Sequence, residues 1–387
     1  TVADNKGGPA GIENRGTATI RDSTVTGGDG GNSGGIGNYF GHLTLVNSSV
    51  SGNEGSNTGG VINEHGTVYI SGSRIENNFG YYQTGGLDND GILFLVDSTV
   101  SGNSSGAGGT TGGIRNAGYD TYLYMSGSTV SGNDGNNNGG IGSSLGDLVV
   151  VNSTVSGNFS YLGLPAVQMD GGYLWNVTIA DNSAGVALDL DHAPVELRNV
   201  VLGQPTGINC RFTENAIDLG GNLSDDDSCP PFFGELTGLD PVLADNGGPT
   251  ETHALLPGSS AVDAGGACGL APDQRGFLRD AGCDSGAFEL GATESVGGIV
   301  TGLDGRRVNC MNETSGQSVQ IVLGGATAWD CTAAGLVVVP GDRVAQRVSG
   351  EADGSSTAGG SVAGHSVEAV TCRNLSAGEM VACTPAG

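Results

Sequence analysis

The chain has 387 residues, 73 of them glycine, and carries 41 Asp and Glu against 14 Lys and Arg, a formal net charge of −27. We expect no nucleic-acid partner, because clustered Lys and Arg bind phosphates and the only lysine is Lys6. Collagen is excluded because glycine follows no three-residue period, and disorder is disfavoured because apolar residues, 37% of the chain, recur regularly. No run of about 18 apolar residues occurs, which predicts no membrane insertion.

The first half of the chain repeats a unit of the type Thr-Val-Ser-Gly-Asn about every 25 residues. This period is too short for helical repeats, and β-branched segments separated by Gly, Asn and Ser predict strands. The central residues of the copies are Val2, Val25, Val50, Ile75, Val100, Val130, Val155 and Ile179, with Leu202 in a degenerate ninth copy.

Each period holds three predicted strands. The first begins with Gly and an aliphatic residue, the second alternates apolar residues as at Leu43 and Leu45, and the third is the repeated unit itself. Alternation directs the aliphatic residues to one face, and one residue per coil at each site stacks them into columns. The sequence therefore predicts an all-β fold, with a right-handed parallel β-helix of about eight or nine coils over residues 1–209.

Asparagine recurs at two corners of the predicted coil. Asparagine tolerates left-handed backbone, and its amide can bond the coils above and below, so we expect internal ladders rather than functional sites. One column contains Asn5, Asn53, Asn78, Asn103, Asn133, Asn158 and Asn182, and the other contains Asn14, Asn38, Asn63, Asn89 and Asn116.

An aromatic stripe is predicted on the outer side of the second strand. Coils stack about 4.8 Å apart, so Tyr69, Phe94 and Tyr124 should form a continuous exposed row, with Tyr173 further along. Such a row could stack on sugar rings or bury a neighbouring protein surface. A self-stacking ladder that stabilises a flat sheet is an equal alternative.

Catalytic groups are scarce along the predicted solenoid. Hydrolysis of a polysaccharide needs paired carboxylates, and neither His42 nor His65 has such a pair in matching columns. A calcium-dependent lyase needs carboxylates on adjacent coils and a base, for which Asp88, Asp90 and Arg115 are the candidates. We expect these three to be solvated turn residues, and we expect no enzyme.

One acidic run is a candidate calcium site. Asp225, Asp226 and Asp227 are consecutive and could bind calcium at the surface. The alternative that we favour is an acidic loop without a metal. No cofactor is required by the sequence.

The eight cysteines lie in the second half of the chain. None has the close spacing of a zinc knuckle, so disulfides and an oxidising, extracellular setting are favoured. Pairing of sequence neighbours would close four short loops, although other connectivities are open. The neighbouring pairs are Cys210 with Cys229, Cys268 with Cys283, Cys310 with Cys331, and Cys372 with Cys383.

Residues 219–289 follow the repeats with a different pattern. The motifs GGNLS at 220–224, LDPVLADNGGPTETHALL at 239–256, GSSAVDAG at 258–265, DQRGFLR at 273–279 and CDSGAFE at 283–289 resemble the choice-of-anchor Q domain in sequence and order. The resemblance implies an exported bacterial β-helix protein, secreted or on the cell surface, and no catalytic residues. We predict a cap over residues 210–290, held by ion pairs of Arg275 and Arg279 with Asp263 and Asp284.

The last segment, 291–387, alternates again. Apolar and polar residues alternate over 318–323 and 335–340, and turn signals separate these runs. The pattern predicts a small antiparallel β-sandwich.

The function predicted from the sequence is that of a non-catalytic extracellular structural or adhesive protein. Thr1 and Val2 enter in the middle of a coil, and an uncovered coil can pair with another chain, so we expect head-to-tail self-association into a filament. A polysaccharide-binding module that uses the aromatic stripe is the first alternative. A polysaccharide lyase or hydrolase is the second, supported by fold analogy alone.

Overall fold

The computed structural model describes residues 1–7, 11–183, 185–190, 193–204, 206–212, 215–266, 268, 272–277, 279–280 and 282–291. Beyond residue 291 it describes eight strands between Gly297 and Ala382. The chain divides into two compact units. Unit 1 comprises Thr1–Asn246, Thr250–Gln274 and Arg279–Leu290, and unit 2 comprises Gly247–Pro249, Arg275–Leu278 and Gly291–Gly387.

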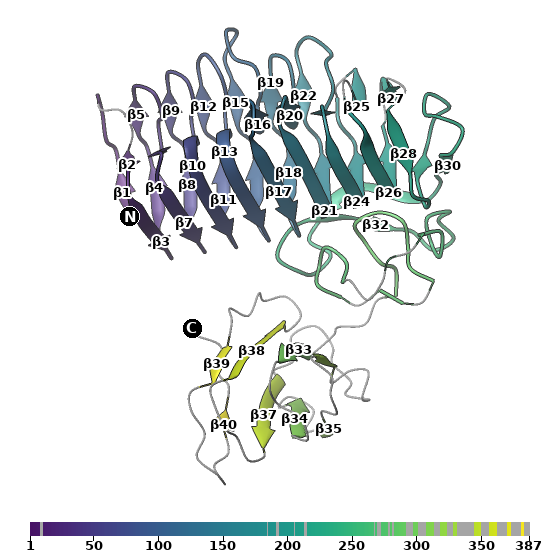
Figure 1. Ribbon diagram of the computed structural model, residues 1–387. Helices are drawn as coiled ribbons and strands as arrows, with labels where there is room; N and C mark the ends of the chain where they lie inside the picture. The colour runs from purple at the N-terminus through teal and green to yellow at the C-terminus, as the bar shows by residue number, and fades with distance from the viewer. Residues whose placement is uncertain are drawn as a thin grey trace. The chain divides into compact units, whose positions relative to one another are not determined.

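Unit 1 is built on a parallel β-solenoid of about nine coils with the predicted repeat of about 25 residues (Figure 1). Its strands stack in three main columns, in which each strand pairs in parallel with the coils before and after it. The first column contains β2 (Ile12–Asn14), β6 (Ile36–Tyr39), the starts of β10 (Val61–Ser71) and β13 (Leu87–Val96), β16 (Ile114–Ala117), β20 (Ile141–Ser144), β23 (Val167–Met169), β25 (Val186–Leu190) and β27 (Ile208–Phe212).

The other two main columns follow the same plan. The second column contains β3 (Thr17–Arg21), β7 (His42–Val46), the ends of β10 and β13, β17 (Tyr122–Ser126), the starts of β21 (Asp147–Ser156), β24 (Gly172–Ala180) and β26 (Val195–Gly203), and β28 (Ala216–Asp218). The third column contains β1 (Val2–Ala3), β4 (Thr24–Thr26), β8 (Ser49–Ser51), β11 (Arg74–Glu76), β14 (Thr99–Ser101), β18 (Thr129–Ser131), the ends of β21, β24 and β26, β29 (Leu223–Ser224) and β30 (Gly234–Glu235).

A fourth column of very short strands, which the sequence did not predict, follows the third. Each strand has two residues, and together they form a separate six-stranded parallel sheet along one edge of the coils (Figure 1). They are β5 (Asp29–Gly30), β9 (Glu54–Gly55), β12 (Phe79–Gly80), β15 (Ser104–Ser105), β19 (Asp134–Gly135) and β22 (Phe159–Ser160).

The registers place one aliphatic residue per coil at each inward site. In the second column Val68 pairs with Leu93, Leu93 with Leu123, and Leu123 with Leu148. All four side chains are at most 2% exposed. The predicted alternation is therefore confirmed, and stacked columns of aliphatic side chains form the core of the solenoid.

The predicted asparagine ladders are present inside the coils. The Asn78 side-chain amide donates to Oδ1 of Asn103 at 2.9 Å, and Asn103 donates to Asn133 over the same distance. The same Oδ1 of Asn103 also accepts the backbone N–H of Asn78, so each buried side chain satisfies the main chain of the previous coil. In the second ladder Ser143 takes the place after Asn116 and accepts its amide at 3.0 Å.

The end of the solenoid is closed by residues that follow β27. The disulfide of Cys210 with Cys229 lies here, and Cys229, Phe232 and Phe233 pack against the core. The strand β30 pairs with β29 and continues the third column. Residues 225–236 thus shield the last coil from solvent.

The described residues of the segments 237–246, 250–274 and 279–290, which we call the side segment, lie along the third column instead of over the end. The hairpin of β31 (Leu239–Ala244) and β32 (Thr252–Leu255) belongs to it. Gln274 accepts a hydrogen bond from Thr154 Oγ1 at 2.6 Å and donates to Thr129 Oγ1 at 2.8 Å. Residues 210–290, which were predicted to form one cap, therefore divide into two parts. The first part closes the end of the solenoid, and the second covers one of its sides.

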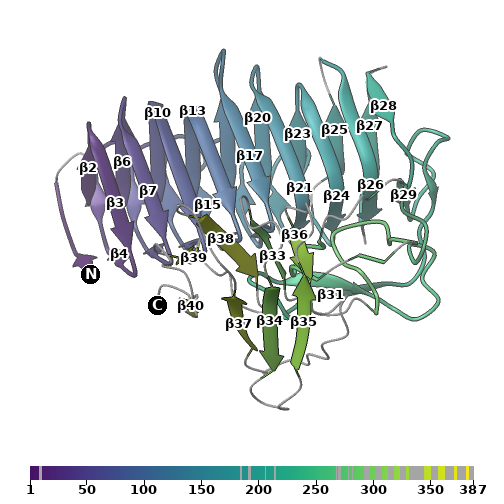
Figure 2. The same ribbon diagram turned by 60° about the horizontal axis from the view of Figure 1, so that its bottom comes forward.

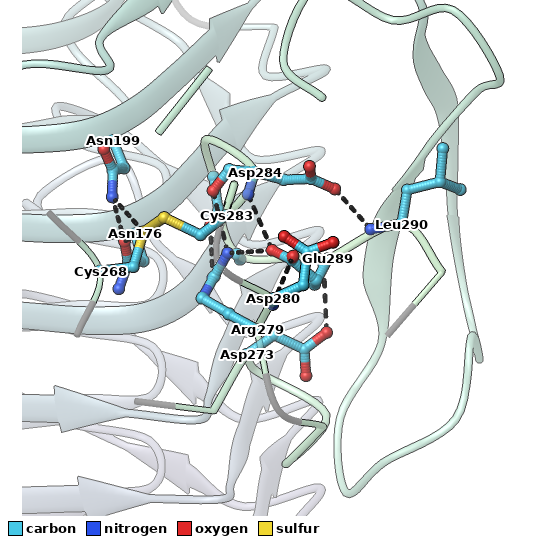
Figure 3. A network of polar contacts seen from close by, with 12 residues as sticks. Asn176, Asn199, Cys268, Asp273, Arg279, Asp280, Cys283, Asp284, Glu289 and Leu290 are labelled. Atoms are coloured by element: carbon cyan, nitrogen blue, oxygen red, sulfur yellow. Dashed lines mark hydrogen bonds and ion pairs between the residues drawn. A yellow bond between two sulfur atoms is a disulfide. The ribbon is translucent and has the colours of Figure 1, made fainter. Parts of the chain in front are cut away.

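A buried polar network holds the last part of the side segment (Figure 3). The Arg279 guanidinium, fully buried, pairs with Glu289 at 3.2 Å and donates to the Asp284 carbonyl at 3.0 Å. The Asp284 carboxylate accepts the backbone N–H of Asp263 at 2.9 Å and that of Leu290. Ion pairs of Arg275 and Arg279 with Asp263 and Asp284 were predicted here. The carboxylate that pairs with Arg279 is instead Glu289, which the prediction did not include.

The described strands of unit 2 form two antiparallel four-stranded sheets (Figure 2). Antiparallel pairing in two sheets agrees with the predicted β-sandwich. Of the two disulfides predicted there, Cys331 and Cys383 lie outside the described residues. One sheet contains β33 (Gly297–Val300), β36 (Ala328–Asp330), β38 (Ser356–Ser361) and β39 (Val370–Cys372), and the other β34 (Arg307–Asn312), β35 (Ser318–Val322), β37 (Val344–Ser349) and β40 (Val381–Ala382).

Candidate functional site

The predicted aromatic stripe forms on the outer side of the second column. Tyr69 pairs in register with Phe94, and Phe94 with Tyr124. The ring centroids are 6.3 Å and 6.2 Å apart, with the ring planes tilted by 42° and 49°. Tyr69 is 40% exposed, and the other two rings are half-buried. The rings therefore pack against one another and also leave part of their surface to solvent.

The stripe widens toward the later coils. Phe94 also contacts Tyr122, with ring centroids 6.1 Å apart. Two coils after Tyr124, Tyr173 stacks on Trp175 at 4.3 Å. Val149 lies between these two groups in the same column and is only 3% exposed. Burial raises the pKa of Tyr122 and of Tyr173, so both phenols stay neutral and can donate hydrogen bonds to a ligand at neutral pH.

An outward carboxylate is buried in the first column. Asp88 is 4% exposed and pairs with Arg115 of the next coil, Nη1 to Oδ1 2.7 Å. It also accepts the hydroxyls of Thr58 at 3.3 Å and Thr84 at 3.4 Å. Burial raises the pKa of Asp88, and Arg115 opposes that shift. The expectation of a solvated turn is wrong for Asp88, because the turns carrying these threonines stand beside the strand and exclude water.

The three residues considered for a lyase do not form one site. Asp90 faces His65, with Oδ2 3.8 Å from Nε2, while Arg115 is paired with Asp88. A second pair of the same kind, Asp189 with Arg211, occupies the same column further along, and Asp189 is 5% exposed. In each pair a carboxylate and a guanidinium neutralise each other across adjacent coils, which is what a structural ion pair requires.

The acidic run at 225–227 lies at the closed end of the solenoid. Asp225 accepts the side-chain amide of Asn209 at 2.6 Å. Burial raises the pKa of Asp226, but hydrogen bonds from Ser228 and the Asn209 backbone outweigh it and hold the pKa below its ordinary value. All three aspartates line a cavity of about 630 Å³. In the part of the chain that the structure describes, no group of three His, Cys, Asp or Glu side chains is arranged to hold a metal ion.

Two of the predicted disulfides are formed. Cys210 bonds Cys229, and Cys268 bonds Cys283, with Cα atoms 4.9 Å and 6.4 Å apart. The second lies beside the solenoid, where Asn199 donates to the Cys268 sulfur at 3.0 Å (Figure 3). It therefore anchors the side segment next to the third column. At the other end, Val2 pairs with Val25 as the repeat predicted.

Exposed aromatic side chains lie in pairs along the fourth column, and the sequence did not predict this grouping. Phe79 packs edge-to-face on Tyr81, and Phe159 packs in the same way on Tyr161. The signal was present, because the same pattern, Asn-Phe-x-Tyr, follows the repeated unit at 78–81 and at 158–161. Because no strand was predicted at this edge, the register between the two segments was not known.

No protein-family model, no curated protein and no solved structure matches the chain. Among the residues that the structure describes, none belongs to a helix long and apolar enough to cross a membrane.

Proposed function

We propose that this chain is an extracellular, non-catalytic structural or adhesive protein. The observation that carries the proposal is the continuous asparagine ladder, in which Asn53, Asn78, Asn103, Asn133 and Asn158 each donate to the next coil at 2.9 Å. The side chains are fully buried or nearly so, so sliding one coil over the next would leave amides without partners. The ladder therefore holds neighbouring coils of the solenoid in one register.

Other features support placement outside the cell. The disulfides of Cys210 with Cys229 and Cys268 with Cys283 are typical of proteins from oxidising compartments. The resemblance of residues 219–289 to the choice-of-anchor Q domain supports the finer proposal of a bacterial surface or secreted protein. Association with further copies of the chain is part of the same proposal.

Electron microscopy of the purified protein, with and without a calcium chelator, tests the structural role. The structural proposal expects ordered fibres or side-by-side assemblies of rods. A parallel assay follows new reducing ends and unsaturated products on pectate and on neutral polysaccharides. Product release that is abolished in Asp88→Asn and retained in the matched variant Asp189→Asn would overturn the non-catalytic proposal.

A second candidate function, polysaccharide binding, is favoured by the exposed part of the aromatic stripe. Tyr69 offers 40% of its surface to solvent, and ring faces bind the apolar faces of sugars. Pull-down with insoluble uronate polymers tests it. The stripe is supported if Tyr69→Ala/Tyr124→Ala abolishes retention, and it is rejected if the double variant binds as the parent does.

A further inference from the structure

Two aromatic pairs project from the fourth column at equivalent positions. In β12, Phe79 packs edge-to-face on Tyr81 with ring centroids 4.7 Å apart and planes at 86°. In β22, Phe159 packs on Tyr161 at 4.9 Å and 88°. Tyr81 and Tyr161 are 49% and 65% exposed. Each tyrosine is therefore buttressed by a phenylalanine and still offers ring surface to solvent, which makes it a rigid platform.

The spacing of the pairs follows from the strand register. Phe79 pairs with Ser104, Ser104 with Asp134, and Asp134 with Phe159. The two pairs are thus three coils apart, or about 14 Å at about 4.8 Å per coil. Both pairs lie at the edge formed by the fourth column, where β15 and β19 separate β12 from β22 (Figure 1).

The residues between the pairs are small or polar. Ser104 and Asp134 occupy the two intermediate positions of the phenylalanine line. On the tyrosine line, the backbone N–H of Gly106 bonds the Gly80 carbonyl, and the Tyr161 N–H bonds Gly135, which places Gly106 and Asn136 between the tyrosines. A Cβ at Gly106 would lie 2.9 Å from the Tyr81 carbonyl oxygen, so the backbones of the two coils approach closely there.

We propose that this row, from Phe79 and Tyr81 through Ser104, Asp134 and Asn136 to Phe159 and Tyr161, binds a neutral β-1,4-linked polysaccharide along the solenoid axis. Chains of equatorially linked sugars are straight ribbons whose apolar ring faces stack on aromatic rings. Their hydroxyls donate to a carboxylate such as Asp134 and exchange hydrogen bonds with an amide such as Asn136. The Asp134 carboxylate, in the middle of the row, disfavours polyanions such as pectate at this site.

This proposal is independent of the structural role and of the aromatic stripe, which lies on the second column. A ligand long enough to contact both pairs gains from the second contact without new translational cost, so affinity should rise steeply with chain length. A short ligand that contacts one pair gains nothing from the other. Chain-length dependence is therefore the signature of two platforms at a fixed spacing.

The test is calorimetric titration of the full chain with disaccharides and hexasaccharides of β-1,4-linked glucose, xylose and N-acetylglucosamine. We expect at least one hexasaccharide to bind at least tenfold more tightly than its disaccharide. Tyr81→Ala and Tyr161→Ala should each remove most of that advantage, since one aromatic contact corresponds to a fold-change of about ten. The control is Tyr119→Ala, which removes an aromatic side chain that is 82% exposed elsewhere.

Three outcomes would overturn the proposal. The first is that no neutral hexasaccharide binds, and the second is that pectate fragments bind more tightly than neutral ones. The third is that binding survives in Tyr81→Ala/Tyr161→Ala but is lost in Tyr69→Ala/Tyr124→Ala, which would transfer the site to the stripe. Circular dichroism of every variant verifies that the solenoid is intact, because all the substituted tyrosines are exposed or half-exposed and outside the core.

Discussion

Removal of one asparagine side chain from the middle of the ladder should lower the free energy of unfolding far more than removal of an asparagine side chain outside it. Asn103 is fully buried. Its side chain accepts from the Asn78 amide and backbone N–H, and it donates to the Ile75 carbonyl and to Asn133. Asn103→Ala deletes these four hydrogen bonds and leaves their partners buried. At about 1 kcal/mol for each bond, the free energy of unfolding should fall by about 4 kcal/mol.

The matched control is Asn136→Ala. Asn136 is only half-buried, and its side-chain amide makes a single bond, 3.3 Å long, to the Ala107 carbonyl. This substitution should cost less than about 1 kcal/mol. Urea unfolding gives the free energies, and native-state hydrogen exchange shows whether the amides of coils adjoining residue 103 lose protection first. Equal losses in the two variants would refute the idea that the ladder locks the coils together.

Three further predictions concern charged and titratable groups. Burial raises the pKa of Asp97 to about 6, so the ionised carboxylate destabilises the fold at pH 7. Asp97→Asn should raise the free energy of unfolding, measured in urea, by about 1 to 3 kcal/mol, and this gain should shrink as the pH falls through 6. Arg279→Ala leaves the Glu289 carboxylate buried without its cation and should lower the free energy of unfolding by about 3 to 5 kcal/mol. Arg74→Ala, at an exposed pair with Glu76, should lower it by under about 1 kcal/mol. Similar losses of stability in thermal unfolding of the two variants would contradict the burial argument. Burial lowers the pKa of His253, which contacts Ser156 Oγ at 2.7 Å, so protonation of the unfolded state should reduce stability as the pH falls below about 6.5. His253→Gln should weaken this dependence of the unfolding free energy on pH between pH 7 and pH 5. An unchanged dependence would exclude His253 as its source.

The sequence predicted the solenoid because its pattern is local and repeated. A β-branched unit every 25 residues or so, with alternating aliphatic residues before it, admits one stacking in which every coil buries the same positions. That stacking predicts the register of Tyr69 with Phe94 and of Asn78 with Asn103, and the structure confirms both. Two disulfides between sequence neighbours were predictable for the same reason, since both partners lie close along the chain.

Only the tertiary structure decided how the coils are covered. Thr129, Thr154 and Ser156 face outward in the repeat and look solvated, yet all three are at most 1% exposed. Thr154 and Ser156 form hydrogen bonds with Gln274 and His253, about a hundred residues later in the chain. Periodicity specifies which side of a strand a residue occupies, but whether that side meets water depends on segments that do not repeat, and their contacts exist only once the chain has folded.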